Sequence, residues 1–172
     1  ITDIGFMTAR AGSLQYDRLF KEAFIRPGLD QKRWDNRSNY VALNVLPTGR
    51  NEMSIWHRSG HRYVLRTDGF ISINAGIEPG EVVTKPFRFS GRHLELNVST
   101  SAAGRVRVEI QNAAGQPVAG FRLSDCEPVV GDAIDHRVSW KNSADVSGLV
   151  GQTIRLRFQL EEADLYAMRF AP

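Results

Sequence analysis

Strict alternation of apolar and polar residues is the feature that most constrains the fold of this 172-residue chain. The alternation is clearest in 93–98 (HLELNV), 105–110 (RVRVEI) and 153–160 (TIRLRFQL). A period of two residues places successive side chains on opposite faces of a β-strand, so each segment has one buried face and one face in water. Antiparallel sheets show this pattern, which predicts a β-sandwich.

Shorter strands are predicted in the rest of the chain, separated by turns that contain Gly, Pro and Asp. Before residue 67 they are expected at 40–46, 52–56 and 62–66. After it, further strands are expected at 70–74, 82–84, 134–140 and 165–170. The sequence thus predicts an all-β fold whose sandwich core contains Leu94, Leu96, Val98, Val106, Val108, Ile110, Ile154, Leu156, Phe158 and Leu160.

The charge distribution indicates two parts. Residues 1–66 carry 11 Lys and Arg against 6 Asp and Glu, whereas residues 67–172 carry 11 against 13. Strand rhythm and loop character also change near Arg66–Phe70. We therefore expect sheet material over 1–67 and an antiparallel β-sandwich over 68–172.

Several classes of site are disfavoured by the sequence. The chain contains neither a phosphate-binding glycine loop nor a GxSxG nucleophile turn, and its one cysteine, Cys126, permits no intrachain disulfide and no cysteine-based zinc site. We interpret Cys126 as a small buried residue, Trp140 as a core residue, and His57 and His61 as hairpin residues. We expect no metal ion, no cofactor and no catalytic residues in this chain.

Two partner classes are also disfavoured. No apolar run approaches the ~20 residues of a membrane-spanning helix. The best strands alternate aliphatic with charged residues and lack the exposed aromatic runs that bind single-stranded nucleic acid. We therefore expect neither a membrane nor a nucleic acid as partner. A single cysteine fits a reducing compartment without excluding export, so the location stays open, with secretion or the periplasm as candidates.

The irregular segment 20–39 (FKEAFIRPGLDQKRWDNRSN) carries the most chemistry. Glu22 and Arg26 lie close in sequence to an aromatic ring, Phe24, and a second group containing Arg37, Asn39 and Tyr40 follows. Rings stack on the apolar faces of sugars, while carboxylates, guanidinium groups and amides bond their hydroxyls. The alternative is an ordinary loop in which Glu22 and Arg26 form an ion pair. Spacing alone does not separate these interpretations.

Longer motifs resemble a known family. The stretches LRTDGFISINAG, TKPFRFSGRHLELNVSTSAAGRVRVEIQNAAGQPVAGF and VSWKNSADVSGLVGQTIRLRFQLEEADLYAMRF resemble the C-terminal β-sandwich of bacterial glycosidase-like proteins. These proteins are similar to family 32 glycoside hydrolases, in which a five-bladed β-propeller precedes the sandwich. The earlier motifs GFMTAR, EAFIRPG and NRSNYVALNVLPTGRNEMSIW resemble the final propeller blade.

The resemblance implies that the chain is the C-terminal part of a larger protein whose catalytic carboxylates lie in earlier blades. It places segment 20–39 at the funnel where substrate binds. Glu22, Arg26, Arg37, Asn39 and Tyr40 are then candidates for carbohydrate contact, with Trp34 as a stacking platform.

Three classes of function follow. The first, which the resemblance favours, is an accessory portion of a glycoside hydrolase-like protein that stabilises the propeller and lines its substrate funnel. The second is a stand-alone carbohydrate-binding module. The third is a structural interaction domain. The expected partners are an oligo- or polysaccharide and the remainder of the same polypeptide or another subunit.

Overall fold

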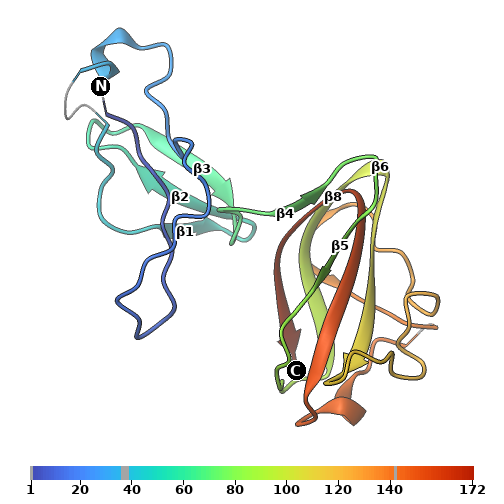
Figure 1. Cartoon of the computed structure of the whole chain (residues 1–172). Coiled ribbons are helices and arrows are strands. Elements are labelled where there is room, and N and C mark those ends of the chain that lie inside the picture. The colour runs from blue at the N-terminus through green and yellow to red at the C-terminus, as the bar shows by residue number, and fades with distance from the viewer. Residues whose placement is uncertain (1, 36–38, 142) are drawn as a thin grey trace. The chain divides into compact units, whose positions relative to one another are not determined.

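The computed structural model of the chain describes residues 2–35, 39–141 and 143–172. Among these residues it contains two antiparallel β-sheets and two short 3-10 helices, η1 (Gln31–Arg33) and η2 (Ser147–Leu149), but no α-helix (Figure 1). No helix among them has the length and apolar character needed to cross a membrane. The predicted all-β fold is confirmed.

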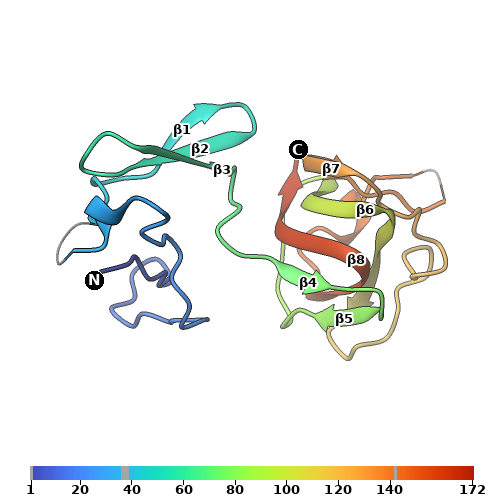
Figure 2. The same ribbon diagram turned by 90° about the horizontal axis from the view of Figure 1, so that it is seen from above.

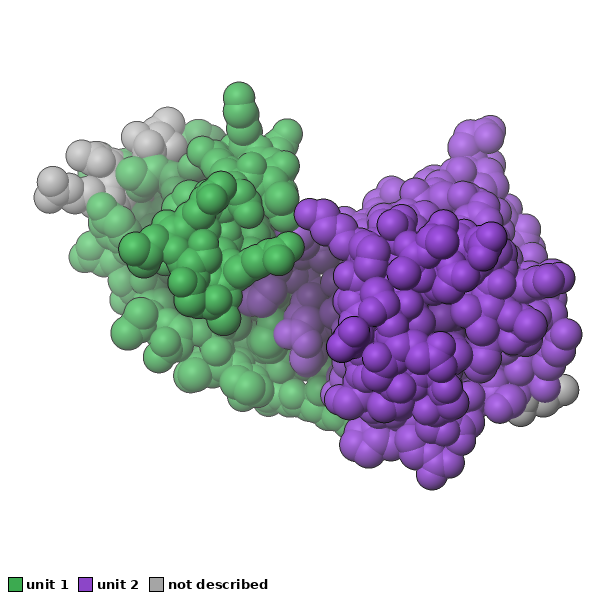
Figure 3. Space-filling view, turned by 60° about the horizontal axis from the view of Figure 1, so that its bottom comes forward, with its two compact units in different colours: residues 1–65 green, residues 66–172 purple. Residues whose placement is uncertain are grey.

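The chain divides into two compact units, Ile1–Leu65 (unit 1) and Arg66–Pro172 (unit 2) (Figure 3). This division lies two residues before the boundary expected from the sequence. Unit 1 holds a three-stranded sheet in the order β1 (Leu46–Gly49), β2 (Glu52–Trp56), β3 (Arg62–Arg66). The last residue of β3, Arg66, is counted with unit 2.

The strand predicted at 40–46 is largely wrong. Val41 forms an isolated bridge with His57, the residue after β2, and continuous pairing with β2 begins only at Leu46, opposite Ser54. Between these points Asn44 has a φ of 76°, in the left-handed region that asparagine tolerates better than most residues. The pattern of alternation therefore continues through a segment whose backbone leaves the sheet.

Unit 2 is built on two long strands, β6 (His93–Asn112) and β8 (Ile154–Ala171). They pair antiparallel from His93↔Ala171 to Asn112↔Ile154, and both curve strongly (Figure 2). The shorter strands β4 (Ile73–Ala75) and β5 (Gly80–Val83) pair with different parts of β8, and β7 (Asp132–Arg137) pairs with β6. The result is a sandwich-like five-stranded unit.

A β-bulge keeps β6 continuous where the sequence predicts two separate strands. Thr100 pairs with Ala163 and Arg105 with Glu161, so four residues of β6 lie opposite one residue of β8. A Cβ atom at Gly104 would lie 2.3 Å from the carbonyl oxygen of Glu162, so only glycine fits at this crossing. The bulge bends the ribbon without ending its pairing.

The predicted sandwich core is confirmed. All ten residues expected there from alternation are at most 2% exposed, and Trp140 is equally buried. The ring of Phe121 packs edge-on against the indole of Trp140, with ring centroids 5.3 Å apart. Because β6 and β8 each place every second residue inward, the two strands alone supply most of this core.

At Val108 of β6, two side chains supply the hydrogen bonds that a neighbouring strand would otherwise make. The backbone N–H of Val108 donates to Sγ of Cys126 (3.2 Å), and its carbonyl oxygen accepts from Nε1 of Trp140 (2.8 Å). Both groups would otherwise be buried without a partner. Cys126 and Trp140 are therefore core residues, as predicted, and they also complete the hydrogen bonding of an irregular edge.

Arg66 fastens the start of unit 2 to the sheet. Its Nε donates to Oδ1 of Asn97 (2.9 Å), its Nη1 lies 2.7 Å from Oδ1 of Asp132, and its guanidinium lies 4.3 Å from the ring centroid of Tyr166. Asn97 in turn donates to the backbone oxygen of Thr67 (2.5 Å). These contacts attach residues 66–67 to β6, β7 and β8.

Unit 1 buries little apolar surface. Among its described residues only Ile25 and Ile55 are buried hydrophobics. Eleven large hydrophobic side chains are exposed, namely Met7, Leu14, Tyr16, Leu19, Leu29, Trp34, Tyr40, Leu43, Val45, Leu46 and Val64. Exposed apolar side chains in this number are typical of a surface that another sheet or protein covers.

Replacing Leu156 with alanine is expected to lower the free energy of unfolding of unit 2 by about 2–5 kcal/mol, because the side chain is fully buried and leaves a cavity. Urea unfolding followed by fluorescence in a Trp34→Phe, Trp56→Phe background measures this, since Trp140 is then the last of three tryptophans. Val83→Ala, at an exposed position, should change stability by less than about 0.5 kcal/mol. Equal unfolding midpoints for the two variants would contradict the assigned core.

Cys126 is expected to resist alkylation in the folded protein, because burial raises the pKa of its thiol to about 11. Iodoacetamide labelling at pH 8 should be slow in buffer and fast in urea. The unfolded thiol ionises near pH 9. The stability linked to the neutral thiol is therefore full below pH 9 and is lost as the pH rises towards 11. Labelling at the rate of free cysteine would contradict this burial.

Candidate functional site

The segment predicted to bind carbohydrate begins beside the first residues of unit 1. The backbone N–H of Phe24 donates to the carbonyl oxygen of Ile4 (2.7 Å), and the N–H of Ile4 donates to the carbonyl oxygen of Ile25 (3.0 Å). The ring of Phe6 lies 5.4 Å from that of Phe24 and 6.0 Å from that of Phe20. These contacts fix residues 24–25 against 4–6.

A turn at Gly28 and the short helix η1 then bring Trp34 back towards Gly28. Gly28 has a φ of 75°, which a residue with a side chain would adopt only with strain. Helix η1 is capped by Asp30, whose Oδ1 accepts from the N–H of Lys32 (3.0 Å). Nε1 of Trp34 donates to the carbonyl oxygen of Gly28 (2.8 Å), so the indole is held against the turn.

Arg33 and Asn39 hold this loop together. Nε of Arg33 donates to Oδ1 of Asn39 (3.0 Å), and Nη2 of Arg33 donates to the carbonyl oxygen of Arg26 (3.3 Å). Nδ2 of Asn39 donates to the carbonyl oxygens of Thr2 (2.5 Å) and Arg33 (2.8 Å). The guanidinium of Arg33 also lies 5.6 Å from the ring centroid of Tyr63 in β3. The loop is thus tied both to the chain start and to the sheet.

An open pocket of about 510 Å³ lies on this loop. Its lining contains an aromatic ring from Trp34, a guanidinium from Arg26 and a carboxylate from Asp3, together with Ala23, Pro27, Gly28 and Leu29. Trp34 is 49% exposed, so one part of the indole is available to a ligand. The side chain of Arg26 makes no hydrogen bond or ion pair with any residue that the structure describes, and in particular no ion pair with Glu22.

The structure separates the six predicted site residues. Arg26 and Trp34 line the pocket. Asn39 is 1% exposed, and its amide forms hydrogen bonds within the loop and to Thr2. It can therefore affect a ligand only by keeping the loop in its conformation. Glu22 is exposed next to the lining residue Ala23, whereas the half-exposed Tyr40 is not part of the lining. Arg37 lies outside the described residues.

Asp3 belongs to the pocket but was not among the predicted residues. The sequence gives only a weak sign of this. In the structure the side chains of residues 2–8 alternate between partly buried and exposed, and Asp3 is one of the exposed residues. Its proximity to Trp34 depends on the pairing of Ile4 with Ile25, which joins residues 21 positions apart. Alternation alone does not specify that pairing.

The two histidines of unit 1, His57 and His61, lie in the hairpin between β2 and β3. Nδ1 of the buried His57 lies 2.6 Å from Oγ of Ser59 and accepts from the N–H of Ser59 (3.1 Å). The His57 and His61 rings are 6.0 Å apart. Within 2–35, 39–141 and 143–172, no group of three or more His, Cys, Asp or Glu is arranged to hold a metal ion.

Comparison with known proteins gives no relative. No family model, no curated protein and no solved structure matches this chain significantly. The chemistry of the pocket itself is the remaining guide to its function, and it combines the tethered ring of Trp34 with the Arg26 guanidinium and the Asp3 carboxylate.

Replacing Asn39 with alanine is expected to loosen the loop, because the change removes the acceptor of the Arg33 Nε–H and the donor to the Thr2 carbonyl oxygen. The loss of stability should be about 1–3 kcal/mol. Limited trypsin digestion should then cut faster after Lys32 and Arg33. The exposed Asn51→Ala variant is the control and should be cut at the original rate. Unchanged cleavage of the Asn39 variant would contradict this positioning role.

Proposed function

We propose that this chain is the C-terminal accessory portion of a carbohydrate-active, glycoside hydrolase-like protein. Unit 1 contributes material of a propeller blade, and its loop forms part of the wall of a carbohydrate site. Unit 2 stabilises the parent protein, and the catalytic residues lie elsewhere in that protein. The observation that carries the proposal is the pocket in which Trp34 lies beside Arg26 and Asp3.

The chemistry of this pocket suits a sugar ring. An indole face packs against the C–H groups of a pyranose, while a guanidinium donates hydrogen bonds to its hydroxyls and a carboxylate accepts hydrogen bonds from them. The bond from Trp34 to Gly28 holds the indole in place before a ligand arrives, so less conformational entropy is lost on binding. The guanidinium of Arg26, which has no partner among the described residues, can donate to a hydroxyl.

The exposed apolar residues of unit 1 support the blade assignment. A propeller blade is a small antiparallel sheet whose faces are covered by the neighbouring blades. Unit 1 has a three-stranded sheet, two buried hydrophobic residues among those described, and eleven large exposed ones. Such a sheet gains a core when further sheets pack against it.

The same surface supports an alternative, in which unit 1 is a structural interaction domain that binds another subunit. A stand-alone carbohydrate-binding module is the remaining alternative, and it would use the same pocket. The intact mass of the protein from its native host separates these. A mass well above 19.3 kDa supports the accessory portion, and a mass of 19.3 kDa supports one of the alternatives.

A test of the pocket uses the 172-residue chain and a panel of neutral oligosaccharides, namely malto-, cello-, xylo- and mannohexaose. Because the chain supplies only one wall, we expect weak binding, seen in NMR spectra as a shift of the Trp34 indole N–H signal. Trp34→Ala and Arg26→Ala should each weaken binding at least tenfold. Arg58→Ala, which removes an exposed cation outside the pocket, is the matched control.

Two results would overturn the proposal. One is the absence of any response to the whole panel, both in this chain and in the full-length parent. The other is binding that the Trp34 and Arg26 variants retain at the level of the Arg58 control. Concentration-dependent self-association in sedimentation, without sugar binding, would favour the interaction domain.

A further inference from the structure

The outward face of β5, β6 and β8 carries a regular array of charged and amide side chains, which we call the arginine face. Alternation places hydrophobic residues inward on these strands and directs the opposite set away from the core, although two of that set, Glu109 and Gln111, are only 4% and 8% exposed. The face consists of Glu81 from β5, Arg105, Arg107, Glu109 and Gln111 from β6, and Arg155, Arg157, Gln159 and Glu161 from β8. Antiparallel register pairs Arg107 with Gln159, Glu109 with Arg157, and Gln111 with Arg155.

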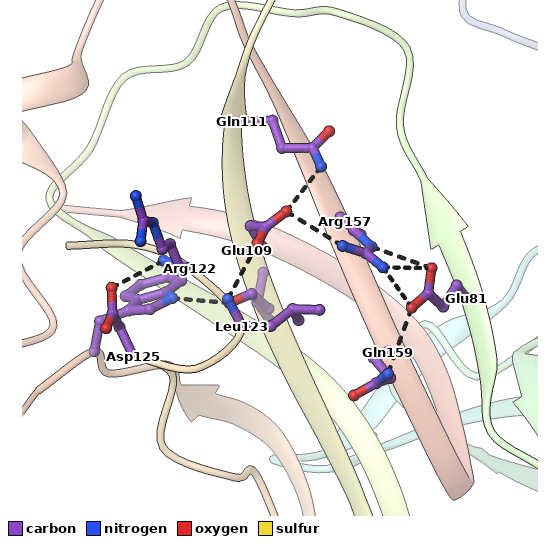
Figure 4. A network of polar contacts seen from close by, with 10 residues as sticks. Glu81, Glu109, Gln111, Arg122, Leu123, Asp125, Arg157 and Gln159 are labelled. Carbon is purple, nitrogen blue, oxygen red and sulfur yellow. Dashed lines mark hydrogen bonds and ion pairs between the residues drawn. The ribbon is translucent and has the colours of Figure 1, made fainter. Parts of the chain in front are cut away.

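All three carboxylates of this face form ion pairs with arginines of the same face. Nη2 of Arg157 lies 2.7 and 2.9 Å from the two oxygens of Glu81, and its Nη1 lies 3.6 Å from Oε1 of Glu109 (Figure 4). Glu109 also accepts from Nε2 of Gln111 (2.8 Å) and from the N–H of Leu123 (3.2 Å). Glu161 pairs with Arg105 at 2.5 Å.

Arg107 and Arg155 have no such partner. The Nε atom of each is buried without a hydrogen bond, and neither guanidinium forms an ion pair with any residue that the structure describes. Both side chains are half-buried. A buried Nε–H without an acceptor is unfavourable, and a ligand that brings oxygen acceptors to the guanidinium would relieve this cost. The face therefore has two positions, Arg107 and Arg155, at which a bound anion would be stabilised.

The two positions are too far apart for one small anion. Arg155 lies opposite Gln111, which is four residues along β6 from Arg107. At about 3.4 Å per residue this is a separation of about 14 Å along the strands. Between them lie Arg157, which is shared between Glu81 and Glu109, and the amide of Gln111. A ligand that satisfies both arginines must carry separated anionic groups with neutral polar groups between them.

We propose that the arginine face binds an acidic polysaccharide through the carboxylates of its uronic acid residues. The sugar carboxylates accept from Arg107 and Arg155, and the hydroxyls between them contact the partly exposed Arg157 and Gln159. A nucleic acid fits less well, since Glu81, Glu109 and Glu161 lie on the same face and would repel a dense row of phosphates. No aromatic side chain lies among the outward residues of this face to stack on bases.

This site is separate from the pocket of unit 1 and does not depend on it. The ligand differs too, because the pocket is assigned to neutral sugars. Failure of one proposal therefore leaves the other standing.

The test measures binding of the 172-residue chain to polygalacturonate by affinity electrophoresis and titration calorimetry, with dextran as the neutral polymer. Binding to polygalacturonate and not to dextran is expected. Arg107→Gln and Arg155→Gln should each weaken it about tenfold, because each removes one charge-assisted contact. Arg58→Gln removes an equal charge from an exposed arginine of unit 1 and should leave affinity unchanged. Added salt should weaken binding to the parent chain.

A second measurement avoids reliance on the variants. In the unsubstituted chain, polygalacturonate should shift the arginine Nε–H NMR signals of Arg107 and Arg155 and leave that of Arg58 in place. The proposal is overturned if both variants bind like the Arg58 variant, or if the Arg107 and Arg155 signals do not move. It is also overturned if single-stranded DNA or dextran sulfate binds and polygalacturonate does not.

Discussion

The antiparallel pairing of β6 with β8 is the interaction on which unit 2 depends. Every other strand of the unit attaches to one of these two, and their inward residues form most of the core. The bulge at 101–104, where Gly104 passes the carbonyl oxygens of β8, bends the ribbon so that its two halves share one interior. The same alternation that fills this interior fixes which arginines and carboxylates lie outside, so core and arginine face have one origin.

Unit 1 is held by a different kind of interaction. With two buried hydrophobic residues among those described, its irregular loop relies on hydrogen bonds from Arg33 and Asn39 and on the pairing of Ile4 with Ile25. Polar contacts of this kind are directional, so they can place Trp34 and Arg26 accurately without a large core. They also leave much apolar surface uncovered, which is why a covering partner enters the proposed function.

Local periodicity was enough to predict the all-β fold, the ten core residues and the positions of β2 and β3. It could not predict that 93–98 and 105–110 form one strand, since this depends on Gly104 meeting β8. It also extended a strand through Asn44, whose backbone leaves the sheet. In the pocket, Arg26 and Trp34 were candidates for carbohydrate contact from their chemistry and from the family resemblance, and this role stays a prediction, whereas Asp3 joins them through a distant pairing. Asn39 was assigned to ligand contact because sequence carries no direct sign that an amide is buried.

The register of β6 and β8 has a consequence for synthesis on the ribosome. His93, at the start of β6, pairs with Ala171, at the end of β8, so 78 residues separate the two members of the outermost pair. The edge of β6 that pairs with β8 has no partner until nearly all of unit 2 has emerged, whereas β7 can pair with the other edge earlier. The nascent chain therefore holds one edge of an apolar strand unpaired until β8 is made, and the sandwich closes only after β8 has been translated.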